Sequence, residues 1–173
     1  TSTKDLLASV LSAAAPTVAP VGSLNSEVGV PLTIFRVEPT TRFLVAEMGA
    51  RGIGHIAYLA AIAEPTIGIE LNVGSAHVGE FGSREAIGRA KAELVQALPE
   101  TGLAVLNADD PVVRGMAAQT VARVQLVGTA ADADVRATDI TLDQAGRPRF
   151  TVTTSHGSAD VSLPLYGEHH VGN

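Results

Sequence analysis

The chain has 173 residues, of which 46% are hydrophobic and only 3% aromatic, so its core must be built mainly from aliphatic side chains. Its formal net charge is −6 and its Lys and Arg residues are scattered, which excludes nucleic acid as an expected partner. The absence of cysteine excludes disulfides, cysteine-based zinc sites and thiol nucleophiles. The longest uncharged apolar run, residues 56–63, is far shorter than the roughly 20 residues that a membrane span needs.

The first third of the chain opens on a helical pattern. Residues 3–14 carry an apolar stripe at helical spacing and predict a helix, and the Gly, Ser, Asn and Pro residues of 22–31 predict a loop. A short helix is expected at 31–37. The run RFLVAEMGA, residues 42–50, is typical of a strand buried on both faces of a parallel sheet. The pattern of residues 52–63 predicts the next helix.

The middle of the chain alternates strand and helix patterns. Residues 66–73, 102–108 and 123–128 predict strands, and residues 84–98 predict a helix between the first two. Asp110 stands before a proline and predicts the start of another helix. This alternation is typical of an α/β fold with a mostly parallel sheet flanked by helices.

The pattern changes after residue 128. Residues 129–165 contain short alternating strand patterns with turns and no helix between them. They predict a small antiparallel β appendage near the C-terminus of the same domain. Because the sequence opens within a helical pattern and stops at GEHHVGN, we expect a piece of a longer protein.

Polar side chains follow the predicted strands, and ligands of open parallel sheets gather at the carboxyl ends of strands. Glu47 ends the first strand pattern, His77 follows the second, and Asn107 ends the third. A carboxylate and an imidazole on neighbouring strand ends suit a divalent cation, and carboxylate oxygen is the ligand that Mg²⁺ prefers. Read singly, Glu47 is better explained as a solvated or helix-capping residue and His77 as an exposed loop residue.

Two further features have more than one reading. Lys91 lies at the edge of the apolar stripe of the 84–98 helix, where its stem could simply cover apolar surface. The opening TSTKD is typical of a helix N-cap. It also matches the residues that come after the Gly-Lys of a Walker A loop, whose final hydroxyl binds magnesium, although the Gly-Lys itself is not in the chain.

Six segments occur in the order found in Mur ligases: TSTKDLL, GSLNSEVGVPLT, VAEMGA with RGIGHI, NVGSAHVGEFGSREAIGRAKAEL, LNADDP and GEHHVGN. The chain resembles the central ATP-binding domain of this family, most of all the branch that adds D-alanyl-D-alanine. The resemblance covers about residues 1–115 and 165–173. The run from NVG to AK is its most specific part.

The resemblance implies a P-loop-type sheet and a particular domain organisation. Residues 1–173 would form the central ATPase domain, with a parallel core at 1–128, the β appendage at 129–165 and the start of a closing nucleotide-side segment at 166–173. An N-terminal domain for a UDP-sugar and a C-terminal ligase domain would lie outside the chain. We expect the chain by itself to be inactive, because it lacks both of these domains and the Gly-Lys of the phosphate loop.

The activity implied is an ATP-dependent ligation in peptidoglycan precursor synthesis. ATP would phosphorylate the terminal carboxylate of UDP-N-acetylmuramoyl-tripeptide, and the amine of D-alanyl-D-alanine would displace phosphate from the acyl phosphate. Nucleotide-linked substrates imply a cytoplasmic enzyme, which we expect to be a monomer. Three alternatives stay open: another Mur ligase, a ligase like folylpolyglutamate synthase, and a non-catalytic folded module.

The resemblance also implies roles for residues around two Mg²⁺ ions and the ATP phosphates. Thr1 would bind the first Mg²⁺ with Glu47 as its carboxylate partner, and Ser2 would contact the nucleotide. His77 would bind a second Mg²⁺. Lys91 matches a lysine that related ligases carry as a carbamate, which would offer oxygens to a cation that an ammonium would repel.

The remaining assignments concern ligand positions farther from the metals. Asn25 and Glu27 would lie near the substrate, with a serine between them where the family more often has asparagine. Asn173 would lie near the adenine, although His170 stands where the motif usually has asparagine. Asn107 would shape the nucleotide side of the sheet, and a loop-capping role explains it equally well.

Overall fold

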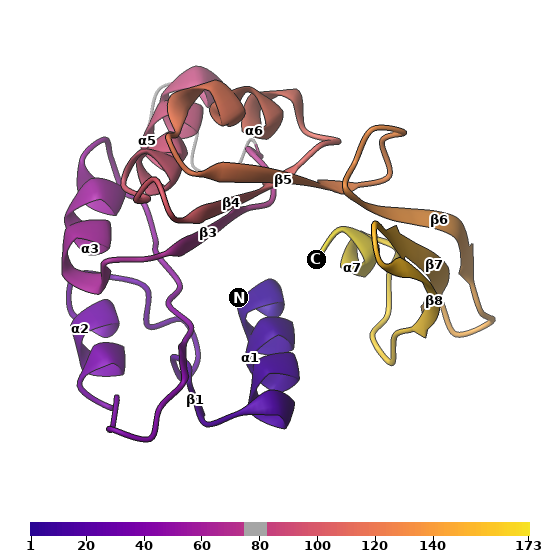
Figure 1. The fold of residues 1–173 in the computed structure, drawn as a ribbon, viewed down its shortest axis with the longest axis horizontal. Helices are drawn as coiled ribbons and strands as arrows, with labels where there is room; N and C mark the ends of the chain where they lie inside the picture. Colours follow the sequence, from indigo (N-terminus) through magenta and orange to yellow (C-terminus); the bar gives the residue numbers. More distant parts are fainter. Residues whose placement is uncertain (75–82) are drawn as a thin grey trace. The chain divides into compact units, whose positions relative to one another are not determined.

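The computed structural model describes residues 1–74 and 83–173, which form two compact units (Figure 1). The first unit comprises Thr1–Pro65 and Ala76–Ala97, and the second comprises Thr66–Ser75 and Leu98–Asn173. The predicted α/β fold is confirmed: helices accompany a mostly parallel sheet that ends in antiparallel strands. Among the described residues, no helix is long and apolar enough to cross a membrane.

The first unit contains four helices and a two-stranded sheet within its described part. The elements are α1 (Ser2–Ala14), β1 (Thr17–Val18), α2 (Gly29–Ile34), β2 (Phe43–Leu44), α3 (His55–Ala63) and α5 (Arg84–Gln96). β1 and β2 pair in parallel. Helix α3 packs against α2 and α5, and each of the three turns apolar side chains inward.

The prediction of a long buried strand at 42–50 is wrong. Strand β2 has only two residues, Phe43 and Leu44, and both are exposed. Its partner β1 is equally short because it lies between Pro16 and Pro20, and proline cannot donate to a sheet ladder. Beyond Val45, whose N–H donates to the Val18 carbonyl, the chain leaves the ladder.

The short helix expected at 31–37 forms earlier, as α2. The Ser26 hydroxyl accepts from the Gly29 N–H at 3.3 Å, which places the first turn inside the segment predicted to be a loop. Serine before a helix commonly supplies this bond. The predicted start is therefore late, because the Gly, Ser, Asn and Pro content of residues 22–31 indicated a loop up to residue 31.

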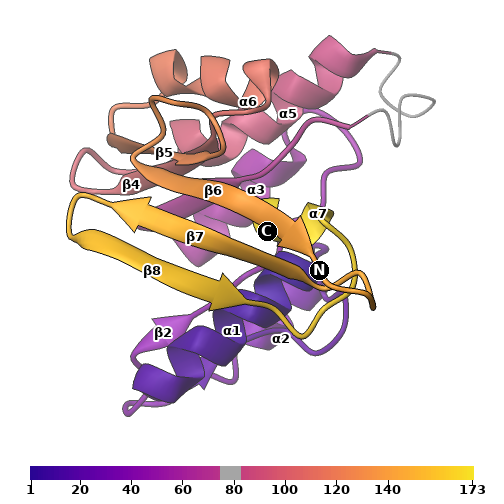
Figure 2. The ribbon, with the colours of Figure 1, turned by 90° about the vertical axis from the view of Figure 1, so that its right-hand side faces the viewer.

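The second unit contains a six-stranded sheet in the order β3-β4-β5-β6-β7-β8. Its strands are β3 (Ile67–Glu70), β4 (Leu103–Asn107), β5 (Arg123–Gly128), β6 (Val135–Leu142), β7 (Pro148–Thr154) and β8 (Gly157–Ser162). Strands β3 to β6 pair in parallel, whereas β6, β7 and β8 pair antiparallel and lie side by side in Figure 2.

The predicted antiparallel strands form, and they continue the main sheet. Strand β6 pairs with the end of β5 through Val127 with Val135 and Gly128 with Arg136. Asp134 fixes this junction because its backbone N–H donates to the Leu126 carbonyl at 2.8 Å while its carboxylate accepts from the Leu126 N–H at 2.7 Å. The short overlap lets two parallel strands join without a crossover helix.

The helical elements of the second unit are short. They are α6 (Pro111–Gly115), the 3₁₀ helix η1 (Met116–Gln119) and α7 (His169–Gly172). The predicted helix start is confirmed, because the Asp110 carboxylate accepts from the N–H groups of Val112 and Val113. Val113 and Met116 are fully buried, together with Leu106 of β4.

Candidate functional site

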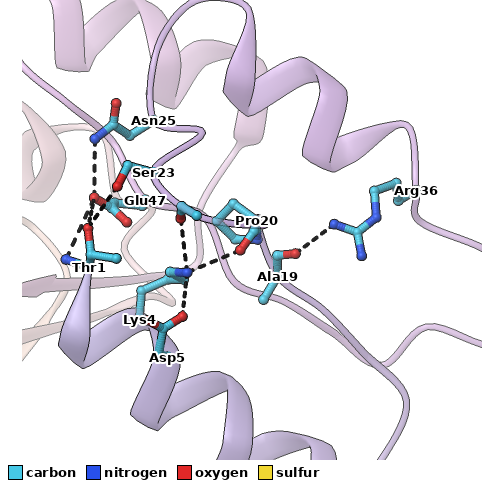
Figure 3. A network of polar contacts seen from close by, with 10 residues as sticks. Thr1, Lys4, Asp5, Ala19, Pro20, Ser23, Asn25, Arg36 and Glu47 are labelled. Atoms are coloured by element: carbon cyan, nitrogen blue, oxygen red, sulfur yellow. Dashed lines mark hydrogen bonds and ion pairs between the residues drawn. The ribbon is translucent and has the colours of Figure 1, made fainter.

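In the first unit, several polar groups converge on one oxygen of Glu47 (Figure 3). The Thr1 hydroxyl donates to Glu47 Oε1 at 3.0 Å, and Asn25 Nδ2 donates to the same oxygen at 3.1 Å. The Thr1 hydroxyl also lies 3.2 Å from the hydroxyl of Ser23. Thr1, Ser23, Asn25 and Glu47 therefore form one hydrogen-bonded cluster, called the Thr1–Glu47 cluster below.

The cluster forms because two loops of the unit approach each other closely. The Gly49 N–H donates to the Asn25 carbonyl at 2.8 Å, two residues beyond Glu47. A Cβ at position 49 would lie 3.1 Å from the Asn25 side-chain carbon, tighter than ordinary contact. Glycine at this position therefore lets the Asn25 amide reach Glu47.

The second oxygen of Glu47 has a different environment. Glu47 Oε2 is buried and has no hydrogen-bond partner within residues 1–74 and 83–173. Buried polar atoms are nearly always paired, so an unpaired carboxylate oxygen marks a place where a ligand would be stabilised. Together with the Thr1 hydroxyl it offers the oxygen donors that Mg²⁺ prefers, and the cluster fits a divalent cation.

The same cluster stands at the N-terminus of a 13-residue helix. Thr1 is the N-cap residue of α1, yet its side chain makes no capping bond, because the hydroxyl is turned toward Ser23 and Glu47. The first N–H groups of a helix have no acceptor within the helix, and the helix dipole favours an anion there. An anionic ligand such as a phosphate suits this position.

Helix α5 shows the alternative use of an N-cap. Its N-cap residue Ser83 accepts from the Ala86 N–H at 3.2 Å, so the hydroxyl completes the helix. Hydrogen bonds from its own backbone N–H and from Ser83 lower the pKa of Glu85 in the same turn. The Ser83 hydroxyl thus bonds to a backbone N–H of its own helix, whereas the Thr1 hydroxyl at the start of α1 bonds to another side chain.

Lys4 supports the cluster from α1, and reasoning from the sequence missed it. Its ammonium is buried and donates to the carbonyls of Pro20 and Gly22, each at 3.1 Å, and to Asp5 Oδ1 at 2.5 Å. The sequence contained a signal, because Lys4 shares a helix face with Leu7 and Leu11. A charged residue within an apolar stripe is costly to bury unless it has a hydrogen-bonding partner there.

Glu93 is another residue that the sequence reasoning missed. Its buried carboxylate accepts from the N–H groups of Gly54 at 2.5 Å and Ala57 at 3.0 Å. It thereby caps α3, whose own N-cap residue is a glycine with φ of 91° and no side chain to offer. Glu93 thus ties α5, which carries Lys91, to the segment that comes after Glu47.

The predicted site residues of the first unit fall into three groups. Thr1, Asn25 and Glu47 are brought together in the cluster. Ser2 and Glu27 are exposed, and Lys91 is half-buried, in keeping with its predicted place at the edge of the buried stripe. His77 lies outside the described residues.

In the second unit, Asn107 and its neighbours hold the ends of strands. Asn107 Nδ2 donates to the Leu71 carbonyl at 2.7 Å, and its Oδ1 accepts from the Asp109 N–H at 2.8 Å. The Asp109 carboxylate accepts from the N–H groups of Thr129 and Ala130 at 2.7 and 2.9 Å. These bonds support the loop-capping interpretation of Asn107.

Asp110 completes this arrangement. Besides capping α6, it accepts from the Val73 N–H at 2.8 Å through its other oxygen. Both oxygens of this buried carboxylate are therefore used by backbone donors. Near the C-terminus, Asn173 Nδ2 lies 3.2 Å from His170 Nδ1, so the two residues of the closing motif contact each other.

Comparison with known proteins assigns the chain to a family. The family model described as the Mur ligase middle domain matches residues 1–173. The chain belongs to the Mur ligase family. Its similarity to the UDP-N-acetylmuramoyl-tripeptide:D-alanyl-D-alanine ligase of Mycobacterium tuberculosis is 52% identity over 173 residues, which is 100% of the chain and 34% of that protein.

Solved structures of Mur ligases agree with this assignment. The crystal structure of MurF from Acinetobacter baumannii superposes with a TM-score of 0.92 at 35% identity, covering 99% of the chain and 38% of that protein. The Thermotoga maritima MurF ligase in complex with ADP gives a TM-score of 0.81 at 31% identity, covering 95% of the chain and 38% of that protein. The chain thus spans about a third of the length of the curated mycobacterial relatives that it matches.

Proposed function

We propose that the protein containing this chain is an ATP-dependent amide-bond ligase that joins D-alanyl-D-alanine to UDP-N-acetylmuramoyl-tripeptide. The chain would be its central nucleotide-binding domain, with a UDP-sugar domain before it and a ligase domain after it. The observation that carries the proposal is the buried, unpaired Glu47 Oε2 beside the Thr1 hydroxyl at the N-terminus of α1. The names of the related proteins supply the substrates.

The Thr1–Glu47 cluster is the proposed Mg²⁺ site. Thr1 and Glu47 would hold a first Mg²⁺, and a carbamylated Lys91 together with His77 would hold a second. A bound Mg²⁺ supplies charge neutralisation on the ATP phosphates during transfer. The Thermotoga relative was solved in complex with ADP, which supports a nucleotide site in the protein that contains this chain.

The reaction follows from the poor reactivity of a carboxylate. An oxygen of the tripeptide carboxylate attacks the γ-phosphorus of ATP, the bond to the β-γ bridging oxygen breaks, and ADP leaves. The amine of D-alanyl-D-alanine then attacks the acyl carbon, loses a proton, and phosphate departs with the C–O bond electrons. The product is an amide, and ATP hydrolysis to ADP and phosphate balances the condensation.

The chain's own residues would bind and orient the reacting groups. The N–H groups at the start of α1 would bind the phosphates, and Ser2 in that turn would contact the nucleotide. Asn25 would hold the Glu47 carboxylate in place, while Glu27 would face the substrate. We also propose Asn107 and Asn173 as residues on the nucleotide side, in a cytoplasmic, monomeric enzyme.

The test is a substrate survey with the full-length ligase. Phosphate release should require ATP, Mg²⁺, UDP-N-acetylmuramoyl-tripeptide and D-alanyl-D-alanine together, and mass spectrometry should find the pentapeptide product. Release with a single amino acid in place of the dipeptide would favour another Mur ligase. Release with a folate substrate and glutamate would favour an enzyme like folylpolyglutamate synthase.

A further measurement concerns the chain by itself. Because it lacks the Gly-Lys of the phosphate loop, the 173-residue chain should bind ATP weakly and release no phosphate with both substrates present. Calorimetric titration with ATP and a phosphate assay would check this. Turnover by the isolated chain would contradict the proposed need for the neighbouring domains.

A further inference from the structure

Lys4 is the buried residue that α1 contributes to the first unit. An ammonium carries three N–H donors, and each has an acceptor here: the Pro20 carbonyl, the Gly22 carbonyl and the Asp5 carboxylate. Removing an ammonium from water is costly unless it is paired and hydrogen-bonded. Lys4 meets this requirement entirely within one helix turn and one loop.

The loop that Lys4 holds leads directly into the cluster. Gly22 precedes Ser23, whose hydroxyl contacts that of Thr1, and Asn25 comes two residues later with its bond to Glu47. Figure 3 shows Lys4 joined by dashed lines to Pro20 and Asp5, and a second set of dashed lines that joins Thr1, Ser23, Asn25 and Glu47. Lys4 stands one turn after Thr1 on the same helix, so its bonds fix the loop relative to the Thr1 hydroxyl.

We infer that Lys4 is a positioning residue for the cation site. By binding the carbonyls of Pro20 and Gly22, it sets where Ser23 and Asn25 stand, and through them it orients the Thr1 hydroxyl and the Glu47 carboxylate. This inference rests on the proposed function, because the oriented groups are those proposed to hold Mg²⁺. Residues that orient metal ligands typically change metal affinity or activity by roughly 10- to 100-fold when they are replaced.

Arg36 offers a matched control. Its guanidinium donates to the Ala19 carbonyl at 2.8 Å, so it also binds a backbone oxygen of the segment that Lys4 holds. Arg36 is exposed, and its partner lies farther along the chain from Ser23 and Asn25 than the partners of Lys4. If any tether of this segment mattered equally, replacing Arg36 would have the same effect as replacing Lys4.

The experiment compares Lys4→Met and Arg36→Met in the full-length ligase. For Lys4→Met, the Mg²⁺ concentration that gives half-maximal rate should rise by about 10-fold, and Mn²⁺ should bind about 10-fold more weakly in the presence of ADP, measured by EPR. Arg36→Met should leave both quantities unchanged. All measurements are made well below the Tm of each variant, which is recorded by calorimetry.

Two results would overturn the inference. A lowered Tm with unchanged Mg²⁺ and Mn²⁺ dependence would make Lys4 a purely structural anchor, and equal shifts in both variants would make the effect a general one of loop tethering. Should Lys4→Met fail to fold, Lys4→Arg carries the test, since it keeps the charge but needs more room. A folded Lys4→Arg variant with shifted Mn²⁺ affinity supports the inference, and unchanged affinity contradicts it.

Failure of the proposed function would look different. In that case the unsubstituted ligase would not consume ATP with its two substrates, or Glu47→Gln would bind Mn²⁺ as tightly as the unsubstituted protein. Either result would remove the site itself rather than the role of Lys4. With both of these checks satisfied, the Lys4 comparison tests only the positioning role.

Discussion

Glu47 of the first unit and Asp110 of the other unit resemble each other in sequence, since each carboxylate comes shortly after a strand. Their surroundings differ in the number of backbone donors. Asp110 accepts three N–H groups over its two oxygens, whereas Glu47 accepts from side chains on one oxygen and leaves the other buried and unpaired within the described residues. A carboxylate whose two oxygens both accept backbone N–H groups stabilises the fold. A carboxylate with one unpaired oxygen is available to a ligand.

The helix starts repeat this difference. Asp110 caps α6, whereas Thr1 stands at the N-cap of α1 without capping it. The Thr1 hydroxyl is hydrogen-bonded to Glu47 and Ser23, so α1 has no side-chain cap. Losing such a cap typically costs about 1 kcal/mol, a stability that a bound anion at the helix start would restore.

Glu47→Gln should have the largest effect on activity. The amide keeps an acceptor for Thr1 and Asn25 but removes the charge, so the proposed ligation activity of the full-length protein should fall by at least about 100-fold, as when one electrostatic contact to a transition state is lost. The Tm should change little. The rate is measured as phosphate release at saturating substrates.

Glu93→Gln is the control for that variant. It makes the same change in the same unit, but at a carboxylate already used by the N–H groups of Gly54 and Ala57. We expect a stability loss of about 1–3 kcal/mol, typical of a weakened charged hydrogen bond, with most of the activity retained. Equal activity losses in the two variants would contradict the distinction between a carboxylate with both oxygens hydrogen-bonded and one with an unpaired oxygen.

Asp110→Ala should have the largest effect on stability. It removes the cap of α6 and leaves the Val73 N–H without its acceptor, which together should lower the free energy of unfolding by about 3 kcal/mol. Urea denaturation would measure this loss. Asp110→Asn keeps one capping oxygen and should lose less, and a stable Asp110→Ala protein would show that the carboxylate has another role.

Asn25→Ala tests how far the bond to Glu47 orients the carboxylate. The structure gives Glu47 Oε1 two side-chain donors, and removing one should reduce activity by about 10-fold with a higher Mg²⁺ requirement. A Mg²⁺ titration of the rate measures both. If only the KM for the UDP-linked substrate changed, Asn25 would instead contact that substrate directly.

The smallest effect is expected at an exposed pair of the second unit. Hydrogen bonds from Arg114 lower the pKa of Asp132, so the pair stabilises the fold above the usual carboxylate pKa, and this stabilisation disappears as pH falls through the lowered pKa of Asp132. Asp132→Asn should therefore lower the Tm slightly at neutral pH. Thermal scans of both proteins should coincide in strong acid, and a difference that persists there would exclude the ion pair as its cause.

Much of the fold could be predicted because its signals are local. The apolar stripes that predict α1, α3 and α5, the strand patterns of β3 to β5 and the cap at Asp110 depend on spacing within a few residues. The strand at 42–50 was overestimated because its length depends on the proline-bounded partner β1, which lies much earlier in the chain. Likewise, the alternating apolar and polar pattern of residues 129–165 indicated strands but not that β6 pairs with β5.

Motifs and periodicity are properties of the chain, so the family, the order of most helices and strands, and the residue types able to hold a cation follow from the sequence alone. The tertiary structure sets which polar atoms are already hydrogen-bonded. It directed the Asp110 and Asn107 side chains to backbone partners, left Glu47 Oε2 unpaired among the described residues, and brought the ammonium of Lys4 to the loop beside Thr1. Hydrogen-bond saturation depends on distances between segments far apart in sequence, and those distances exist only once the chain has folded.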